Sequence, residues 1–134
     1  MSNALAMLNT TPTPTGFAAD DLAECIAACQ DCAQTCTACA DACLAEHHVD
    51  TLVACITADL NCADVCAATA SVLSRQTAYL AGVSLAQLES CRVACRACAD
   101  ECERHAGLHD HCRICAEACR RCERACTALL AATR

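Results

Sequence analysis

The stretch CIAACQDCAQTCTACADAC, residues 25–43, determines what this chain can fold into. Its cysteines follow one another at steps of 4, 3, 4, 3 and 4 residues. Steps of three and four place all of them on one face of an α-helix. Cysteine therefore occupies the seam positions where a helix of a bundle normally carries leucine, and the seven-residue repeat favours a gentle left-handed supercoil.

Three further segments carry cysteine in a similar way. The steps are 4, 3 and 4 over residues 91–102, and 3, 4, 3 and 4 over residues 112–126. Residues 55–66 depart from the pattern, because they hold three cysteines and Asp59 divides the seven-residue gap between the first two. The candidate metal-binding thiols are Cys25, Cys29, Cys32, Cys36, Cys39, Cys43, Cys55, Cys62, Cys66, Cys91, Cys95, Cys98, Cys102, Cys112, Cys115, Cys119, Cys122 and Cys126.

The residues around these stripes favour long helices, since the chain has no proline and only two glycines after residue 16. Ser84 and Gln87 form a capping box, and Gly107 is a C-cap. We expect helices over residues 18–47, 50–79, 84–106 and 109–134. Short connections make neighbouring helices antiparallel, so the chain is predicted to be all-α, an antiparallel up-down-up-down four-helix bundle with a Cys-lined interior.

The predicted bundle domain covers residues 17–134. Residues 1–16 form a leader with room for a short helix over residues 2–8, which Pro12 and Pro14 separate from the bundle.

Composition supports a sulfur-filled core. Of 134 residues 56% are hydrophobic, but 31 are alanine, 18 are cysteine and only 26 are larger apolar residues. The net charge is −7, lysine is absent and aromatic residues make up 1%, which argues against nucleic-acid binding. We also expect no membrane span, because no run of about 18 apolar residues is present.

The two ends of the predicted bundle differ. Four leucines replace cysteine toward the end that holds both termini, where they should form an apolar plug: Leu22, Leu73, Leu88 and Leu129. All five histidines map to the opposite end: His47, His48, His105, His109 and His111. One turn inside that end, a ring of thiols should lie beneath the imidazoles: Cys43, Cys55, Cys102 and Cys112.

Three residues other than cysteine are candidate metal ligands. His105 and His109 extend the stripe beyond Cys102 at steps of 3 and 4 and lead into Cys112. For the other histidines, a position in a loop explains their presence equally well. Asp59 lies among the thiols, where a carboxylate must be paired, protonated, metal-bound or hydrated, so it is a candidate ligand or a neighbour of ligands.

The first seventy residues contain no arginine or lysine, so they lack the positive region of a secretory signal, and we expect a cytoplasmic protein. Cytoplasmic thiols stay reduced, which favours metal binding over disulfides. Two alternatives are cysteines that serve only as small hydrophobic residues and a disulfide scaffold, although neighbours within one helix are poorly placed to pair.

Charge distinguishes the candidate metals. Soft thiolates suit Cu(I), zinc and iron–sulfur clusters. Zinc held by four thiolates leaves about −2 at each buried site, whereas one Cu(I) per bridging thiolate leaves the interior neutral. Iron–sulfur clusters need compact sets of four cysteines, into which a continuous stripe does not divide. No catalytic constellation is evident, so we expect storage or buffering rather than an enzyme.

The Cys-x-x-x-Cys-x-x-Cys stripes over residues 25–43, 91–102 and 112–126 resemble those of the bacterial copper storage proteins, over residues 20–130 or so. The resemblance implies a cytosolic bundle that takes up many Cu(I) ions at the histidine-bearing end. It also implies a homo-oligomer, a tetramer, and a copper donor or acceptor protein as partner. The alternatives are a metallothionein-like buffer for zinc or other soft metals, and an iron–sulfur electron-transfer protein.

Overall fold

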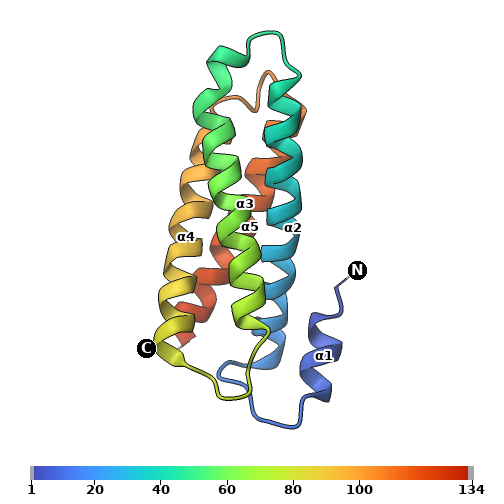
Figure 1. Cartoon of the computed structure of the whole chain (residues 1–134), viewed down its shortest axis with the longest axis vertical. Coiled ribbons are helices and arrows are strands. Elements are labelled where there is room, and N and C mark those ends of the chain that lie inside the picture. Colours follow the sequence, from blue (N-terminus) through green and yellow to red (C-terminus); the bar gives the residue numbers. More distant parts are fainter. Residues whose placement is uncertain (1, 133–134) are drawn as a thin grey trace.

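Four long helices run side by side along the molecule, and a short helix lies outside them (Figure 1). The structure is a computed structural model that describes residues 2–132. Over these residues the elements are α1 (Ala4–Thr10), α2 (Ala19–Leu44), the 3-10 helix η1 (Val49–Leu52), α3 (Val53–Leu73), α4 (Ala81–Glu103) and α5 (Asp110–Ala132). The expected all-α architecture is confirmed.

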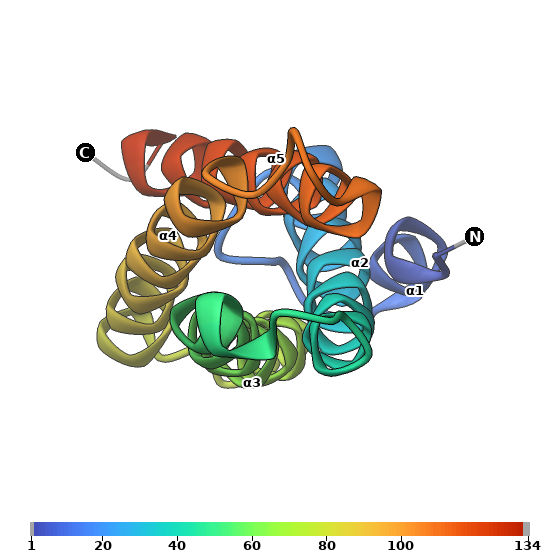
Figure 2. The same cartoon turned by 90° about the horizontal axis from the view of Figure 1, so that it is seen from above.

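The long helices form a closed ring of neighbours. Helix α2 packs against α3 and α5, and α4 packs against the same two helices. Seen from above, the four helices stand at the corners of a square, with α1 outside on α2 (Figure 2). The chain rises in α2, descends in α3, rises in α4 and descends in α5 (Figure 1), which is the expected up-down-up-down order.

The second long helix ends earlier than the sequence predicts. Helix α3 ends at Leu73 rather than at residue 79, and the Gln76 side chain caps this end. Its Nε2 donates to the Leu73 carbonyl at 2.8 Å, and its Oε1 accepts the Gly16 N–H at 2.9 Å. Further on, Ala78 has a φ of 56°, in the left-handed region, which interrupts any helix.

The expected capping box is absent. Helix α4 begins at Ala81, with no side-chain cap on its first turn, so Ser84 already lies inside the helix. The partner residue Gln87 instead reaches to α3, where its Nε2 donates to Thr69 Oγ1 at 2.9 Å. The Thr69 side chain is buried, and its hydroxyl donates to the Val65 carbonyl at 2.7 Å while it accepts from Gln87. Gln87 therefore serves a tertiary contact between α3 and α4 rather than a local cap.

The other long helices also end or begin near their expected limits. Helix α2 ends at Leu44 rather than at residue 47, and α4 ends at Glu103, before Gly107. Both ends therefore leave the histidines in the connections or in the first turn of α5, where side chains from different helices can meet.

The end of the bundle near both chain termini is closed by apolar side chains. Each of four leucines, Leu22, Leu73, Leu88 and Leu129, is at most 1% exposed. Beneath them Phe17 and Tyr79 pack edge to face with centroids 5.7 Å apart. A Cβ on Gly16 would lie 2.6 Å from the Tyr79 ring, so only glycine allows the leader to cross here.

Surface ion pairs tie α5 to both of its neighbours. Arg121 donates to Glu24 and Asp31 of α2 at 2.9 Å and 2.6 Å, and Arg120 donates to Glu103 of α4 at 2.7 Å. These groups are partly exposed, so each pair contributes modestly to stability. They connect helices that carry the thiols.

One segment meets the length and hydropathy of a membrane span, contrary to the expectation from the sequence. It is Val49–Leu73, in which an 18-residue window has a mean hydropathy of 1.4 and is 33% buried. Alanine and cysteine raise its hydropathy, and a core helix of a bundle passes the same test. Here its buried face includes Cys55, Cys62 and Cys66, which point into the bundle.

Candidate metal site

The interior of the bundle is a column of thiols. All eighteen cysteines are buried and free. Close neighbours include sulfurs on one helix, such as Cys32 and Cys36 at 3.7 Å, and sulfurs on different helices. For example, Cys29 Sγ on α2 lies 3.6 Å from Cys122 Sγ on α5 and 3.9 Å from Cys91 Sγ on α4. A disulfide bond is about 2.05 Å long, so these are contacts between separate thiols.

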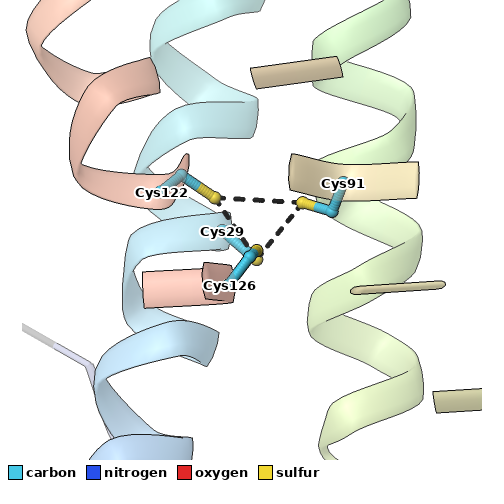
Figure 3. Close-up of side chains that lie close together, drawn as sticks. All are labelled: Cys29, Cys91, Cys122 and Cys126. Carbon is cyan, nitrogen blue, oxygen red and sulfur yellow. Dashed lines mark hydrogen bonds between the residues drawn. The ribbon is translucent and has the colours of Figure 1, made fainter. Parts of the chain in front are cut away.

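The sulfurs gather in sets of four. In Figure 3 the thiols of Cys29, Cys91, Cys122 and Cys126 converge from three helices, and all four sulfurs lie within 4.8 Å of one another. A tetrahedral metal with metal–sulfur bonds of about 2.3 Å separates its sulfur ligands by about 3.8 Å. The sulfur spacing therefore suits a thiophilic metal without rearrangement of the helices.

Successive sets share sulfurs. Three more groups of the same kind are formed by Cys32, Cys66, Cys95 and Cys122, by Cys32, Cys36, Cys62 and Cys119, and by Cys36, Cys98, Cys115 and Cys119. Adjacent groups have in common Cys122, then Cys32, then both Cys36 and Cys119. A shared thiolate can bridge two metal ions, so the column is a continuous chain of sites rather than a row of isolated ones.

Asp59 interrupts the column with a carboxyl group that is fully buried. Its Oδ1 accepts S–H hydrogen bonds from Cys98 at 3.1 Å and from Cys102 and Cys115 at 3.3 Å. Its Oδ2 is buried and has no hydrogen-bond partner. Burial, with the nearby Cys115 and Cys98, raises the pKa of Asp59 to about 10, so the group is a neutral acid near pH 7.

At the open end one histidine reaches the thiols. His111 Nδ1 lies 3.4 Å from Cys39 Sγ and 3.6 Å from Cys112 Sγ. The ring forms a possible metal-binding group with Cys39, Cys43 and Cys112. From the sequence a position in a loop explained His111 as well as metal binding did, although it lies four residues before Cys115, which is one helical step along the same face.

The two histidines that the pattern put forward contact carboxylates. His105 Nε2 is 3.2 Å from Glu101 Oε1, and His109 Nδ1 is 2.9 Å from Glu46 Oε2. His109 also stacks on His111, with ring centroids 5.3 Å apart. His105 and His109 thus lie beside the group that contains His111, at the histidine-bearing end of the bundle, which we call the rim; all three rings are partly exposed.

His47 and His48 lie elsewhere, exposed in the connection between α2 and η1. The predicted thiol ring beneath the rim is present in part as close contacts: Cys55 Sγ is 3.7 Å from Cys102 Sγ, and Cys43 and Cys112 belong to the group with His111.

Burial raises the pKa of two of the outermost thiols, Cys43 and Cys112. Loss of solvent, with the nearby Cys55, raises the pKa of Cys43 to about 11, and burial also raises the pKa of Cys112. Because the thiolate is the form that binds a metal, each of these groups must lose a proton when a metal arrives.

The chain matches the family model of the copper storage proteins over residues 18–131. A structure of the copper storage protein Ccsp from Streptomyces lividans, loaded with 10 copper equivalents, is 55% identical with a TM-score of 0.94, over 96% of this chain and 98% of that one. A five-copper structure of the cytosolic copper storage protein from the same organism is 61% identical with a TM-score of 0.83, over 84% and 93%. No curated protein matches the sequence.

Proposed function

Because the chain belongs to the copper storage protein family, we propose that it stores many Cu(I) ions on the thiolates inside its bundle. The observation that carries this proposal is the sharing of sulfurs between successive four-sulfur groups. Bridging thiolates let the number of bound ions approach the number of sulfurs. That is the property a store needs, whereas a carrier of a single ion needs two or three ligands.

Charge favours Cu(I) over zinc as the cargo. Each Cu(I) that replaces one thiol proton leaves the charge of the interior unchanged, since one positive charge enters and one proton leaves. Zinc bound by four thiolates leaves about −2 per site in a region that excludes water, which is unfavourable. The side chains of the described residues that line the column include no positive charge that could offset a negative zinc site. The one buried carboxyl group, Asp59, is protonated near pH 7.

Uptake begins at the open end in this proposal. His105 and His109 guide Cu(I) at the rim, and His111 Nδ1 with Cys39 and Cys112 receives it. A neutral imidazole needs no deprotonation to bind, so it suits the first step. The ion then passes inward by exchange between shared thiolates, each of which gives up its proton to water or buffer on binding.

Asp59 lies on this path, between the outer thiols and the deeper groups. We assign it to the copper site as a ligand or as a hydrogen-bond acceptor next to the ligands. Three thiol contacts to Oδ1 and the unpartnered Oδ2 support that assignment. The positive charge of a Cu(I) ion bound at Cys98 or Cys115 would lower the pKa of Asp59, and loss of its proton to water would leave a carboxylate oxygen as a ligand.

The cellular compartment and the assembly are also part of the proposal. The relative from S. lividans is described as cytosolic, and we propose a cytoplasmic store here, where thiols stay reduced. Its role is binding rather than catalysis. By family resemblance it works as a homo-oligomer, a tetramer, and exchanges copper with a donor or acceptor protein.

An anaerobic Cu(I) titration of the reduced protein, followed by elemental analysis, tests the proposal. We expect saturation near one copper per thiol, in competition with a Cu(I) chelator. Preference for zinc with saturation at about four ions would support a zinc buffer instead. Iron with labile sulfide and visible absorption would indicate clusters and refute copper storage.

A further inference from the structure

Glu46 lies in the connection after α2 and faces two histidines at once. Its Oε2 is 2.9 Å from His109 Nδ1, and its Oε1 is 3.6 Å from His111 Nε2. We infer that Glu46 is a positioning residue: it holds His111 in the Nε2–H tautomer, so that Nδ1 presents its lone pair to the outermost thiols and to an arriving Cu(I). The consequence for copper rests on the proposed function; the tautomer does not.

The argument starts from the two nitrogens of His111. A neutral imidazole has one N–H and one lone pair. Nδ1 faces Cys39 and Cys112, while Nε2 is buried and lacks a hydrogen-bond partner. A carboxylate attracts an N–H and repels a lone pair, so Glu46 favours the proton on Nε2. A small approach of Glu46 would turn this contact into a hydrogen bond.

The second histidine takes the opposite tautomer. His109 Nδ1 is 2.9 Å from Glu46 Oε2, and a carboxylate at that distance favours the proton on Nδ1. Its Nε2 is then the nitrogen that can bind a metal at the rim. The rings of His109 and His111 stack at an angle of 17° between their planes, which keeps both aligned with the one carboxylate.

Such an arrangement has a chemical purpose. Metal-binding histidines commonly donate their second N–H to a carboxylate, which fixes the ring and raises the basicity of the ligating nitrogen. Without Glu46, His111 could place its proton on Nδ1, where it would face the thiols and block the lone pair. His105 has its own carboxylate, Glu101, at 3.2 Å, so the two pairs can be tested separately.

Nitrogen-15 NMR of the apo-protein, at a pH where imidazoles are neutral, tests the inference directly. We expect Nε2–H at His111 and Nδ1–H at His109 in the unaltered protein. Glu46→Gln replaces one of the two carboxylate oxygens with an NH2 group, which faces one ring and cannot accept its N–H, so at least one ring should become a tautomer mixture. Glu46→Ala removes both oxygens, so both rings should become tautomer mixtures. Glu101→Gln is the control and should leave His109 and His111 unchanged.

A proton on Nδ1 of His111 in the unaltered protein would overturn the inference. The inference would also be overturned if both Glu46 variants kept the tautomers of the unaltered protein. Circular dichroism of each variant checks that the helices are retained, so that a change in tautomer is not attributed to loss of structure.

The copper readout concerns only the outermost site. Glu46→Gln should weaken binding of the first Cu(I) equivalent about tenfold or more, while total capacity stays the same. Equal affinity in the variant and the unaltered protein would refute the positioning role. Failure of the unaltered protein to bind Cu(I) would instead refute the proposed function, and the NMR result on the apo-protein would still stand.

Discussion

The carboxyl group of Asp59 shows how one buried residue can set a property of the whole interior. Three thiols donate to its Oδ1, and burial raises its pKa from 3.8 to about 10. The folded protein therefore keeps this proton over a range in which the unfolded chain releases it. The contribution of Asp59 to the free energy of unfolding of the apo-protein is therefore fully present below about pH 4. This contribution declines as the pH rises toward 10.

The first prediction follows from that sign. Asp59→Asn cannot ionise, so the stability of the apo-variant relative to the unaltered protein should increase by about 1.4 kcal/mol per pH unit between pH 5 and pH 8. Urea denaturation of the reduced apo-proteins at several pH values measures the difference. Parallel pH profiles for the two proteins would show that Asp59 ionises normally in the folded state.

The histidines provide a second prediction at the same scale. The double variant with His105→Ala and His109→Ala should take up Cu(I) more slowly with nearly unchanged capacity, because these rings lie on the rim. His111→Ala should also weaken the binding of the first Cu(I) equivalent, since Nδ1 of His111 lies beside two thiols. Stopped-flow mixing with a Cu(I) chelate complex separates rate from affinity; His48→Ala, exposed in the connection, is the control.

At the scale of the helix, α3 differs from the other three. It has three cysteines, and its other buried inward positions hold Asp59, Thr69 and Leu73. Thr69 uses its hydroxyl to bond the Val65 carbonyl at 2.7 Å and to receive Gln87. Hydrocarbon and internal hydrogen bonds thus replace sulfur at the closed end, which ends the thiol column and stabilises the fold independently of metal.

The third prediction tests that division of roles. Leu73→Ala removes a fully buried side chain from the plug and should lower the free energy of unfolding by about 2–5 kcal/mol. Leu60→Ala, on the same helix with 47% of the side chain exposed, should change it by about 0.5 kcal/mol or less. Thermal denaturation of the apo-proteins measures both. Copper capacity should be the same in the two variants, and a large loss in Leu73→Ala alone would assign the plug a role in binding.

The interior of the bundle works as one extended ligand, because successive four-sulfur groups, from Cys29, Cys91, Cys122 and Cys126 to Cys36, Cys98, Cys115 and Cys119, share sulfurs. Reduced thiols fill the space that leucine fills in an ordinary bundle, at contact distances of 3.6–4.0 Å. In the proposed function each Cu(I) that enters replaces one thiol proton. The interior can be dense in ligands without a large buried charge in either state.

The fourth prediction concerns that exchange. Loading should release close to one proton per Cu(I), and affinity should rise with pH up to about 11 at the outermost site, where the pKa of Cys43 is raised to that value. Below the pKa each thiol must give up a proton, so acid weakens binding. A pH-stat titration counts the protons, and chelator competition from pH 6 to pH 9 gives the affinity; pH-independent affinity would contradict the exchange.

Much of this could be read from the sequence because the relevant signal is local. A repeat of three and four residues defines a helical face wherever it occurs, so the stripes alone indicated four helices, a sulfur-lined interior and a leucine-closed end. Histidine positions near the helix ends likewise followed from counting residues along each helix. The leader and the exact limits of the helices depended on contacts with distant residues, such as Gln76 with Gly16, and were less well predicted.

The grouping of the side chains depended on how the helices are rotated and staggered against one another, which no local repeat specifies. That arrangement joins Asp59 to three thiols on two other helices, brings His111 rather than its neighbours to the sulfurs, and sets Glu46 behind two imidazoles. These contacts span separations of up to dozens of residues. They are determined by packing across the bundle, because the rotation and stagger of the helices decide which side chains come close enough to bind the same metal ion.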